Sequence, residues 1–157
     1  MADPTLDVLV VNGPNLNSLG KRKPDIYGHH TLRDIEESIQ SQAEELGLAV
    51  ECFQSNSEGE IVDHLYQAQA EGCRYVIINA GALTHSSVSV RDALESVEIP
   101  FVEVHISNIH AREEFRHHSF LSPIASGIII GCGVKGYNLA LDLVADRLLS
   151  QREPGTQ

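Results

Sequence analysis

The sequence has only three cysteines, no tryptophan and no recognisable metal-binding motif. Cys52, Cys73 and Cys132 are an odd number with wide, unpatterned spacing, which argues against a disulfide framework. The eight histidines include no HExxH sequence and no Cys-His spacing of the zinc type. We therefore expect reduced thiols and no bound metal.

Basic residues and long apolar runs are also scarce. The chain has 11 Lys and Arg against 22 Asp and Glu, a formal net charge of −11. This balance argues against nucleic acid or an anionic membrane as the main partner, because both are bound through clustered basic residues. No run is long enough for a membrane span, and the N-terminus lacks the basic and apolar regions of a signal peptide. We therefore expect a cytoplasmic protein whose anionic ligand is small.

What remains is an ordinary globular composition. Of the 157 residues, 42% are hydrophobic and 21% are charged. That length suits one hydrophobic core better than two. The sequence therefore predicts a single domain over residues 1–150 and a disordered tail over residues 151–157, without internal repeats.

Short apolar segments rich in β-branched residues alternate with segments of helical period. This alternation predicts an α/β protein with a parallel sheet. The common solution for five such units is a flavodoxin-like three-layer sandwich with strand order 2-1-3-4-5. The predicted strands are Leu6–Asn12, Leu48–Gln54, Tyr75–Asn79, Phe101–Ile106 and Gly127–Gly131.

The helical segments carry recognisable start and stop signals. Side chains that cap helix N-termini precede them, and glycine or proline follows several of them. The basic stretch NIHAREEFRHHS, residues 108–119, also predicts a short helix. Four longer helices are predicted: one that starts at Thr31 and stops at Gly47, one that starts at Ser57 and stops at Gly72, one from Ser86 or Ser87 through Val97, and one from Tyr137 to Leu149.

Polar residues follow three of the predicted strands. Asn12 ends the first and opens the loop NGPNLNSLGKRKPDIYG, NAGALTHSS follows at 79–87, and EVHISN lies at 103–108. In the predicted strand order these three ends are neighbours, and open α/β sheets bind ligands beyond the carboxyl ends of their strands. We therefore expect the active site there.

Two groups in these segments suit proton transfer. Tyr27 has an ordinary pKa of about 10, so it acts as a base near neutral pH only beside a cation such as Arg22 or Arg112. Glu103 and His105 lie two residues apart on one strand and face the same side. The carboxylate can orient the imidazole and favour its protonated form, which makes His105 a candidate general acid.

Other polar residues suit binding, and each has a structural alternative. Asn12 and Asn79 can hold a hydroxyl, a water or a developing oxyanion, and Arg116 can hold a carboxylate. His85 is equally well explained as a helix cap or as a ligand contact. For Tyr27, the structural alternative is a loop aromatic that packs on the body of the protein. Glu103 is more informative, because a buried carboxylate requires a partner.

The sequence GCGVKG at residues 131–136 has the GxGxxG form of a dinucleotide-binding loop. It lies in the last predicted βα unit, with no following strand to position the ribose-binding acid expected about 20 residues on. We expect close packing of the last strand on its helix there.

Three long motifs together resemble one family. LVVNGPNLNSLGKRKPDIYG, NAGALTHSSVSVRDAL and EVHISNIHAREEFRHHSFLSPIASG, in this order, closely resemble the type II 3-dehydroquinate dehydratases. The resemblance extends from Leu6 to about Leu149. It implies a flavodoxin-like fold, a homododecamer built from trimers, and no metal or organic cofactor.

The resemblance also implies a reaction and roles for individual residues. The family converts 3-dehydroquinate to 3-dehydroshikimate by anti elimination through an enolate. Tyr27 would be the base, and Arg22 would hold it as phenolate. Asn12 would stabilise the enolate, largely through a bound water. His105, oriented by Glu103, would be the general acid. Asn79, the Ile106 backbone and Ser107 would hold the substrate carboxylate, and His85 and Arg116 would hold the ring hydroxyls. Asp92 would reach the site of a neighbouring subunit. Arg112 would lie near the base.

Two other classes of function compete with this interpretation. A receiver module would need acidic residues where Asn12 and Asn79 stand, and a flavin-binding module usually offers aromatic ring contacts, whereas this chain has no tryptophan. A scaffold whose active site has decayed is the third possibility. For an enzyme, the loop at residues 12–28 is expected to be a lid that is mobile without ligand.

Overall fold

The computed structural model describes residues 6–21 and 23–150, except for the side chain of Tyr27. Its five strands form one parallel sheet in the order β2-β1-β3-β4-β5, which confirms the predicted fold class and strand order. Four strands are one or two residues shorter than predicted, and β3 matches the prediction at both ends. The strands are β1 (Val8–Asn12), β2 (Val50–Gln54), β3 (Tyr75–Asn79), β4 (Phe101–His105) and β5 (Gly127–Ile130).

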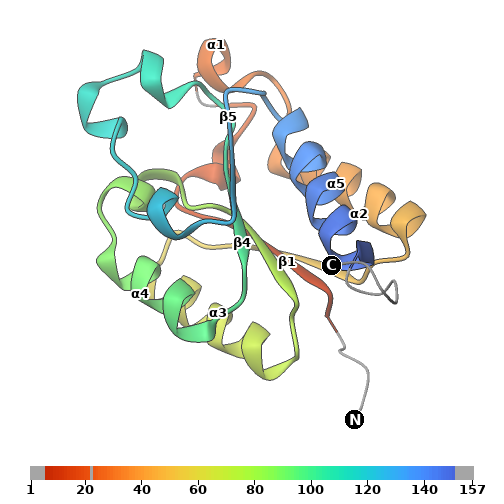
Figure 1. The fold of residues 1–157 in the computed structure, drawn as a ribbon. Helices are drawn as coiled ribbons and strands as arrows, with labels where there is room; N and C mark the ends of the chain where they lie inside the picture. Colours follow the sequence, from red (N-terminus) through yellow and green to blue (C-terminus); the bar gives the residue numbers. More distant parts are fainter. Residues whose placement is uncertain (1–5, 22, 151–157) are drawn as a thin grey trace.

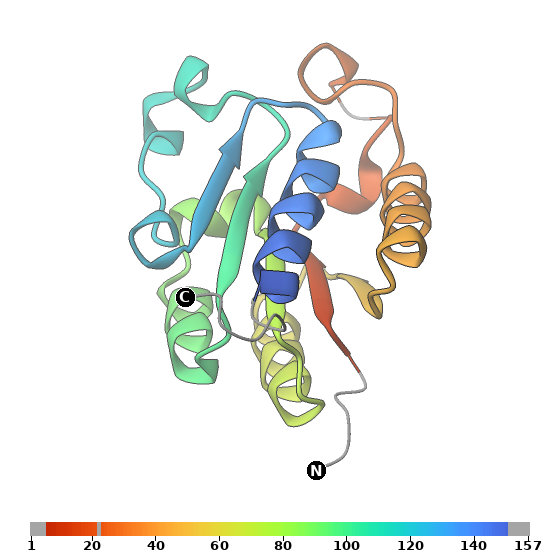
Figure 2. The same ribbon diagram turned by 45° about the vertical axis from the view of Figure 1, so that its right-hand side comes forward.

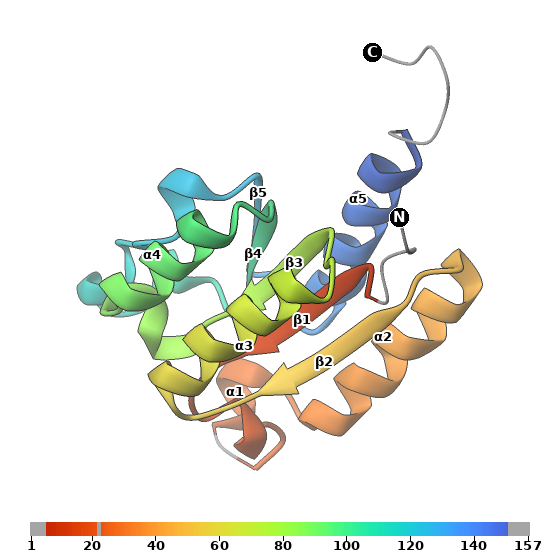
Figure 3. The same ribbon diagram turned by 90° about the horizontal axis from the view of Figure 1, so that it is seen from below.

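Helices cover both faces of the sheet (Figures 1 and 3). One face packs against α2 (Leu32–Leu46) and α5 (Lys135–Ser150), and the other against α3 (Glu58–Ala70) and α4 (Val88–Val97). Successive side chains of a strand point to opposite faces, so β1 contributes to both cores. Its residues 8 and 10 pack on the first pair of helices, and residues 9 and 11 on the second.

The helix starts follow the predicted capping signals. Thr31 Oγ1 accepts a hydrogen bond from the Asp34 amide at 3.2 Å, and Asp34 Oδ2 accepts one from the Thr31 amide at 2.9 Å. This reciprocal pair satisfies two amides that would otherwise lack partners at the start of α2. Ser87, and not Ser86, caps α4 by accepting from the Val90 amide at 2.9 Å. In the described residues, no helix is long and apolar enough to cross a membrane.

Two segments outside the main elements contain short helices. Residues 108–119 hold two 3-10 helices, Ile109–Ala111 and Glu114–Arg116, where a short helix was predicted. The loop after β1 contains a 3-10 turn, Leu16–Ser18, and a one-turn helix, α1 (Pro24–Tyr27), neither of which was predicted. Proline suits the first position of a helix because its fixed φ is already helical and its missing N–H needs no partner there.

Both of these segments lie at the same end of the sheet. Figure 2 shows α1 and the chain that follows β4 beyond the carboxyl ends of the strands. GCGVKG joins β5 to α5 and includes the first two residues of that helix. A Cβ on Gly136 would touch Ile129 Cγ2 and Val104 Cγ1 at 3.4 Å, so α5 packs closely on the sheet at this motif, as predicted.

Candidate active site

A pocket opens at the carboxyl ends of the strands, where the sequence predicts the active site. It contains about 680 Å³ of empty space, part of it open to solvent. Its walls come from the loops after β1, β3 and β4, which are far apart in sequence. The lining residues are Pro14, Asn15, Leu16, Leu19, Asn79, Gly81, Ala82, His85, His105, Ile106, Ser107, Ile109, Arg112 and Arg116.

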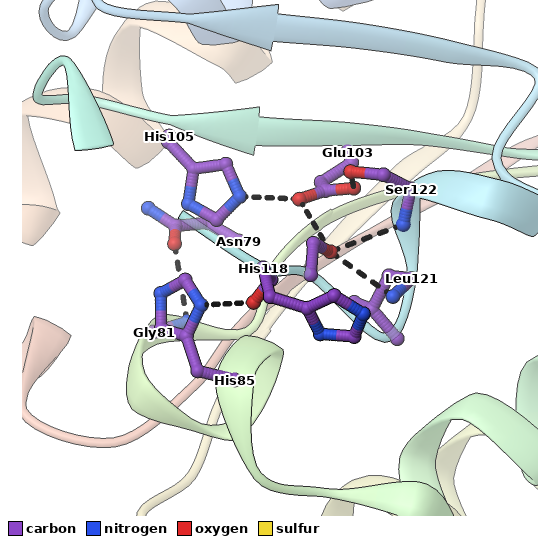
Figure 4. Close-up of polar contacts among 9 residues, drawn as sticks. Asn79, Gly81, His85, Glu103, His105, His118, Leu121 and Ser122 are labelled. Carbon is purple, nitrogen blue, oxygen red and sulfur yellow. Dashed lines mark hydrogen bonds and ion pairs between the residues drawn. The ribbon is translucent and has the colours of Figure 1, made fainter. Parts of the chain in front are cut away.

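His105 and Glu103 form a buried pair under one wall of the pocket. His105 Nε2 lies 2.5 Å from Glu103 Oε2, as their spacing on β4 predicts. The carboxylate also accepts hydrogen bonds from Ser119 Oγ at 3.0 Å and from Ser122 Oγ at 2.6 Å. Figure 4 shows Glu103 beside His105 along the strand, with Ser122 next to its carboxylate. We call these four residues the ionic cluster.

The carboxyl of Glu103 is held in its charged form. Its side chain is fully buried, and burial by itself would raise the pKa. Hydrogen bonds from His105, Ser122 and Ser119, together with the charge of His105, outweigh burial and hold the pKa of Glu103 below its ordinary value of 4.5. A charged carboxylate therefore faces His105 at neutral pH. Sequence reasoning missed the two serines, although it required a partner for Glu103.

His85 faces the pocket beside His105. The two rings are nearly parallel, with centroids 6.2 Å apart. His85 Nδ1 lies 2.8 Å from the His118 carbonyl oxygen, to which it donates (Figure 4). Burial lowers the pKa of His85, and the nearby charges of His105 and Arg116 lower it further. His85 is therefore neutral at neutral pH, and its Nε2 is an acceptor for a ligand hydroxyl.

A second cluster joins the ends of β1 and β3. Tyr137, in the first turn of α5, donates its hydroxyl to Asn12 Oδ1 at 2.5 Å and accepts from Asn79 Nδ2 at 2.9 Å. Asn79 Oδ1 in turn accepts from the Gly81 amide at 3.2 Å. We call these four residues the amide–phenol cluster. Asn12 and Asn79 were predicted for the site, whereas Tyr137 was not.

A glycine allows the two strand ends to approach. The Gly13 amide donates to the Asn79 carbonyl oxygen at 2.8 Å. A Cβ on Gly13 would lie 2.3 Å from the Ala80 carbonyl oxygen, which is closer than two such atoms can come. The loop after β1 can therefore pack against the loop after β3 only with glycine at this position.

Arginine side chains supply positive charge on the far wall. Arg112 Nη1 donates to Ser107 Oγ at 3.3 Å, and Arg116 forms an ion pair with Glu113. Both arginines line the pocket, together with Ile106 and Ser107. In a chain of net charge −11, the pocket wall thus carries two of the few basic side chains.

Of the predicted site residues that the structure describes in full, three do not line the pocket. Asn12 and Glu103 are buried, and Asp92 is exposed on α4. Arg22 lies outside the described residues, as does the side chain of Tyr27, whose backbone ends α1. Across residues 6–21 and 23–150, no group of three or more His, Cys, Asp or Glu side chains is arranged to hold a metal ion.

Comparison with known proteins gives the same result as the motifs. The model of the family described as dehydroquinase class II matches residues 6–145. The chain belongs to the class II dehydroquinase family. A 3-dehydroquinate dehydratase from Acinetobacter baumannii (strain AYE) is 56% identical over 141 residues, which cover 90% of this chain and 93% of that protein. Membership confirms the family predicted from the three motifs, and with it an enzyme.

Solved structures of this family have the same fold. The crystal structure of type II dehydroquinase from Butyrivibrio crossotus DSM 2876 has a TM-score of 0.87 and 46% identity, and the match covers 88% of this chain and 97% of that one. The type II dehydroquinase from Propionibacterium acnes gives a TM-score of 0.85 and 46% identity, with 89% and 96% covered.

Proposed function

We propose that this class II dehydroquinase removes water from 3-dehydroquinate to give 3-dehydroshikimate, by anti elimination through an enolate, in the shikimate or the quinate pathway. The observation that carries the proposal is the buried pair of Glu103 and His105. The pair opens on a pocket formed at three strand ends. Family membership supplies the substrate, because the curated relative is a 3-dehydroquinate dehydratase.

His105 is the general acid in this proposal. It donates a proton to the C1 hydroxyl of the substrate as that group leaves. The charged carboxylate of Glu103 fixes the ring and stabilises the protonated imidazole. The two serine donors keep the carboxylate charged in a buried position, where it would otherwise tend to take up a proton.

Tyr27 is the base in this proposal, and it removes the proton at C2 as a phenolate. Arg22 stabilises the phenolate, and Arg112 lies near the base as a second cation. Asn12 stabilises the enolate, largely through a bound water. Support for Tyr27 comes from the matching motif and from the position of α1, which lies at the pocket end of the sheet (Figure 2).

The remaining polar groups hold the substrate. The Asn79 side chain, the Ile106 backbone and Ser107 bind the carboxylate, and all three residues line the pocket. His85, as a neutral acceptor, and Arg116 bind the ring hydroxyls. No metal or organic cofactor takes part, so dialysis against a chelator should leave turnover unchanged.

The proposal includes a cytoplasmic homododecamer built from trimers, in which Asp92 reaches the pocket of a neighbouring subunit. Asp92 is exposed on α4, so its side chain is free of the core for such a contact. Light scattering should give about twelve times the mass of the 17.2 kDa chain.

The activity is tested by incubating the protein with 3-dehydroquinate and following the ultraviolet absorbance of the conjugated enone. The proposal predicts growth of this absorbance, and a folded sample without it would contradict the proposal. Tyr27→Phe should lose nearly all turnover and still bind the product. If Tyr27→Phe retains turnover comparable to that of the unsubstituted enzyme, Tyr27 is not the base.

A further inference from the structure

The hydroxyl of Tyr137 occupies an unusual position for a residue of a core helix. Its side chain is fully buried, in the apolar cluster between the sheet and α2. The hydroxyl lies between Asn12 and Asn79, the last residues of two adjacent strands, and hydrogen-bonds to both. A phenylalanine would fill the same space, so the oxygen serves these two amides and not the packing.

The hydrogen bonds around Tyr137 all run in one direction. The backbone amide of Gly81 donates to Asn79 Oδ1, Asn79 Nδ2 donates to the Tyr137 oxygen, and the Tyr137 hydroxyl donates to Asn12 Oδ1. The first donor is a backbone group and cannot reverse. Because each acceptor in the series receives one proton, the order fixes the orientation of both amides.

The phenol cannot leave this arrangement by losing its proton near neutral pH. Burial raises the pKa of Tyr137 far above the ordinary value for tyrosine. The hydroxyl is therefore protonated, and a donor, near neutral pH. With its oxygen engaged by Tyr137, the Asn12 amide has its nitrogen on the other side, away from the hydroxyl.

We propose that Tyr137 is a positioning residue for turnover, whose hydroxyl orients the Asn12 amide so that N–H, and not oxygen, serves the enolate. This inference rests on the proposed function, in which Asn12 stabilises the enolate through a water. A reversed amide would present its oxygen to a developing negative charge. Without the hydroxyl both orientations of Asn12 are accessible, so part of the oxyanion stabilisation is lost.

The chain offers a matched control in Tyr75. Its side chain is 3% exposed, and its hydroxyl hydrogen-bonds to Ser126 Oγ and Arg147 Nη1, both at 2.6 Å. It lies at the start of β3, at the opposite end of that strand from Asn79. Tyr75→Phe therefore removes a buried, doubly bonded hydroxyl without touching the pocket.

The test compares kcat and KM for 3-dehydroquinate in Tyr137→Phe and Tyr75→Phe. We expect kcat to fall at least about tenfold in Tyr137→Phe, because removing a whole oxyanion donor costs about 10²- to 10³-fold. Tyr75→Phe should stay within about twofold, with a similar loss of thermal stability. Equal kcat values in the two variants would overturn the proposal. An inactive unsubstituted enzyme would instead overturn the proposed function.

A double-substitution cycle separates positioning from general structure. If Tyr137 acts through Asn12, adding Tyr137→Phe to Asn12→Ala should lower kcat no further. Effects that multiply in the double variant would overturn action through Asn12. A neutron structure of the unsubstituted enzyme needs no substitution at all. It should place the hydroxyl deuterium of Tyr137 on the Asn12 side, and any other position would overturn the assigned direction.

Discussion

The ionic cluster at the end of β4 and the amide–phenol cluster at the ends of β1 and β3 both lie at the carboxyl end of the same sheet. Both are buried and joined by short hydrogen bonds. They differ in charge. Glu103 is held charged next to His105, whereas the amides have no charge and burial keeps the Tyr137 phenol protonated.

This difference separates two tasks that the proposed reaction requires. Proton transfer needs an acidic group placed to deliver a proton, and in the proposed reaction His105 of the ionic cluster is that group. Stabilising an enolate needs donors whose direction does not change, and the neutral cluster holds its donors in one direction near neutral pH. Substitutions in the ionic cluster should therefore lower the rate of proton transfer most. Substitutions near the amide–phenol cluster should act by moving or reorienting Asn12 and Asn79.

The largest effect is expected for His105→Gln. Loss of the proposed general acid should lower kcat by about 10²- to 10⁴-fold. The matched control is His64→Gln, because His64 is also paired with a carboxylate, Glu51, but on the α3 side of the edge strand β2. Steady-state rates with 3-dehydroquinate measure both. Similar losses in the two variants would mean that His105 is one structural histidine among others.

A smaller effect on turnover is expected for Gly13→Ala. The added Cβ would meet the Ala80 carbonyl oxygen and push the ends of β1 and β3 apart. We expect about a tenfold loss of kcat, because Asn12 and Asn79 belong to the proposed reacting and binding groups. Stability should also fall.

Gly47→Ala is the control for that loss of stability. Gly47 ends α2 with φ +69 and has no atom within 4 Å of an added Cβ, so this variant is strained but distant from the pocket. It should lose about 1 kcal/mol of stability through its backbone conformation alone, with unchanged kcat. A Gly13→Ala enzyme with full turnover would break the link between the amide–phenol cluster and catalysis.

The smallest effect concerns acid stability and Glu103→Gln. The folded-state pKa of Glu103 is lowered, so its contribution to stability is present above the ordinary pKa of 4.5 and is lost as the pH falls through the folded-state value. The unsubstituted protein should therefore lose more stability below about pH 4.5 than the glutamine variant. Urea unfolding between pH 6 and pH 3 measures the difference, and parallel curves would indicate that Glu103 has no lowered pKa.

Much of this structure follows from the sequence. Apolar β-branched runs predicted the strands, and the order 2-1-3-4-5 places Asn12 beside Asn79, with the strand of His105 next in the sheet. The pair of Glu103 and His105 followed from the two-residue repeat of a strand. Caps such as Thr31 and Ser87 set helix starts because they act locally.

The features that were missed depend on contacts between distant residues. Tyr137 fits the apolar stripe of α5 and differs from a packing aromatic only in its hydroxyl, whose partners lie 125 and 58 residues away. Ser119 and Ser122 resemble ordinary loop serines. The signal that could have found the serines was Glu103, because a buried carboxylate requires hydrogen-bond donors. The hydroxyl of a tyrosine on an apolar helix stripe requires hydrogen-bond partners in the same way.

The central claim is that the ionic cluster protonates the leaving hydroxyl, while a different group removes the C2 proton. It is tested by incubating His105→Gln with 3-dehydroquinate in D2O and following C2 by NMR, with a protein-free sample as the baseline for spontaneous exchange. The account predicts that recovered 3-dehydroquinate gains deuterium at C2 above the baseline while little 3-dehydroshikimate forms. If exchange falls to the baseline together with dehydration, His105 is needed for removal of the C2 proton, and the division of tasks between the clusters is wrong.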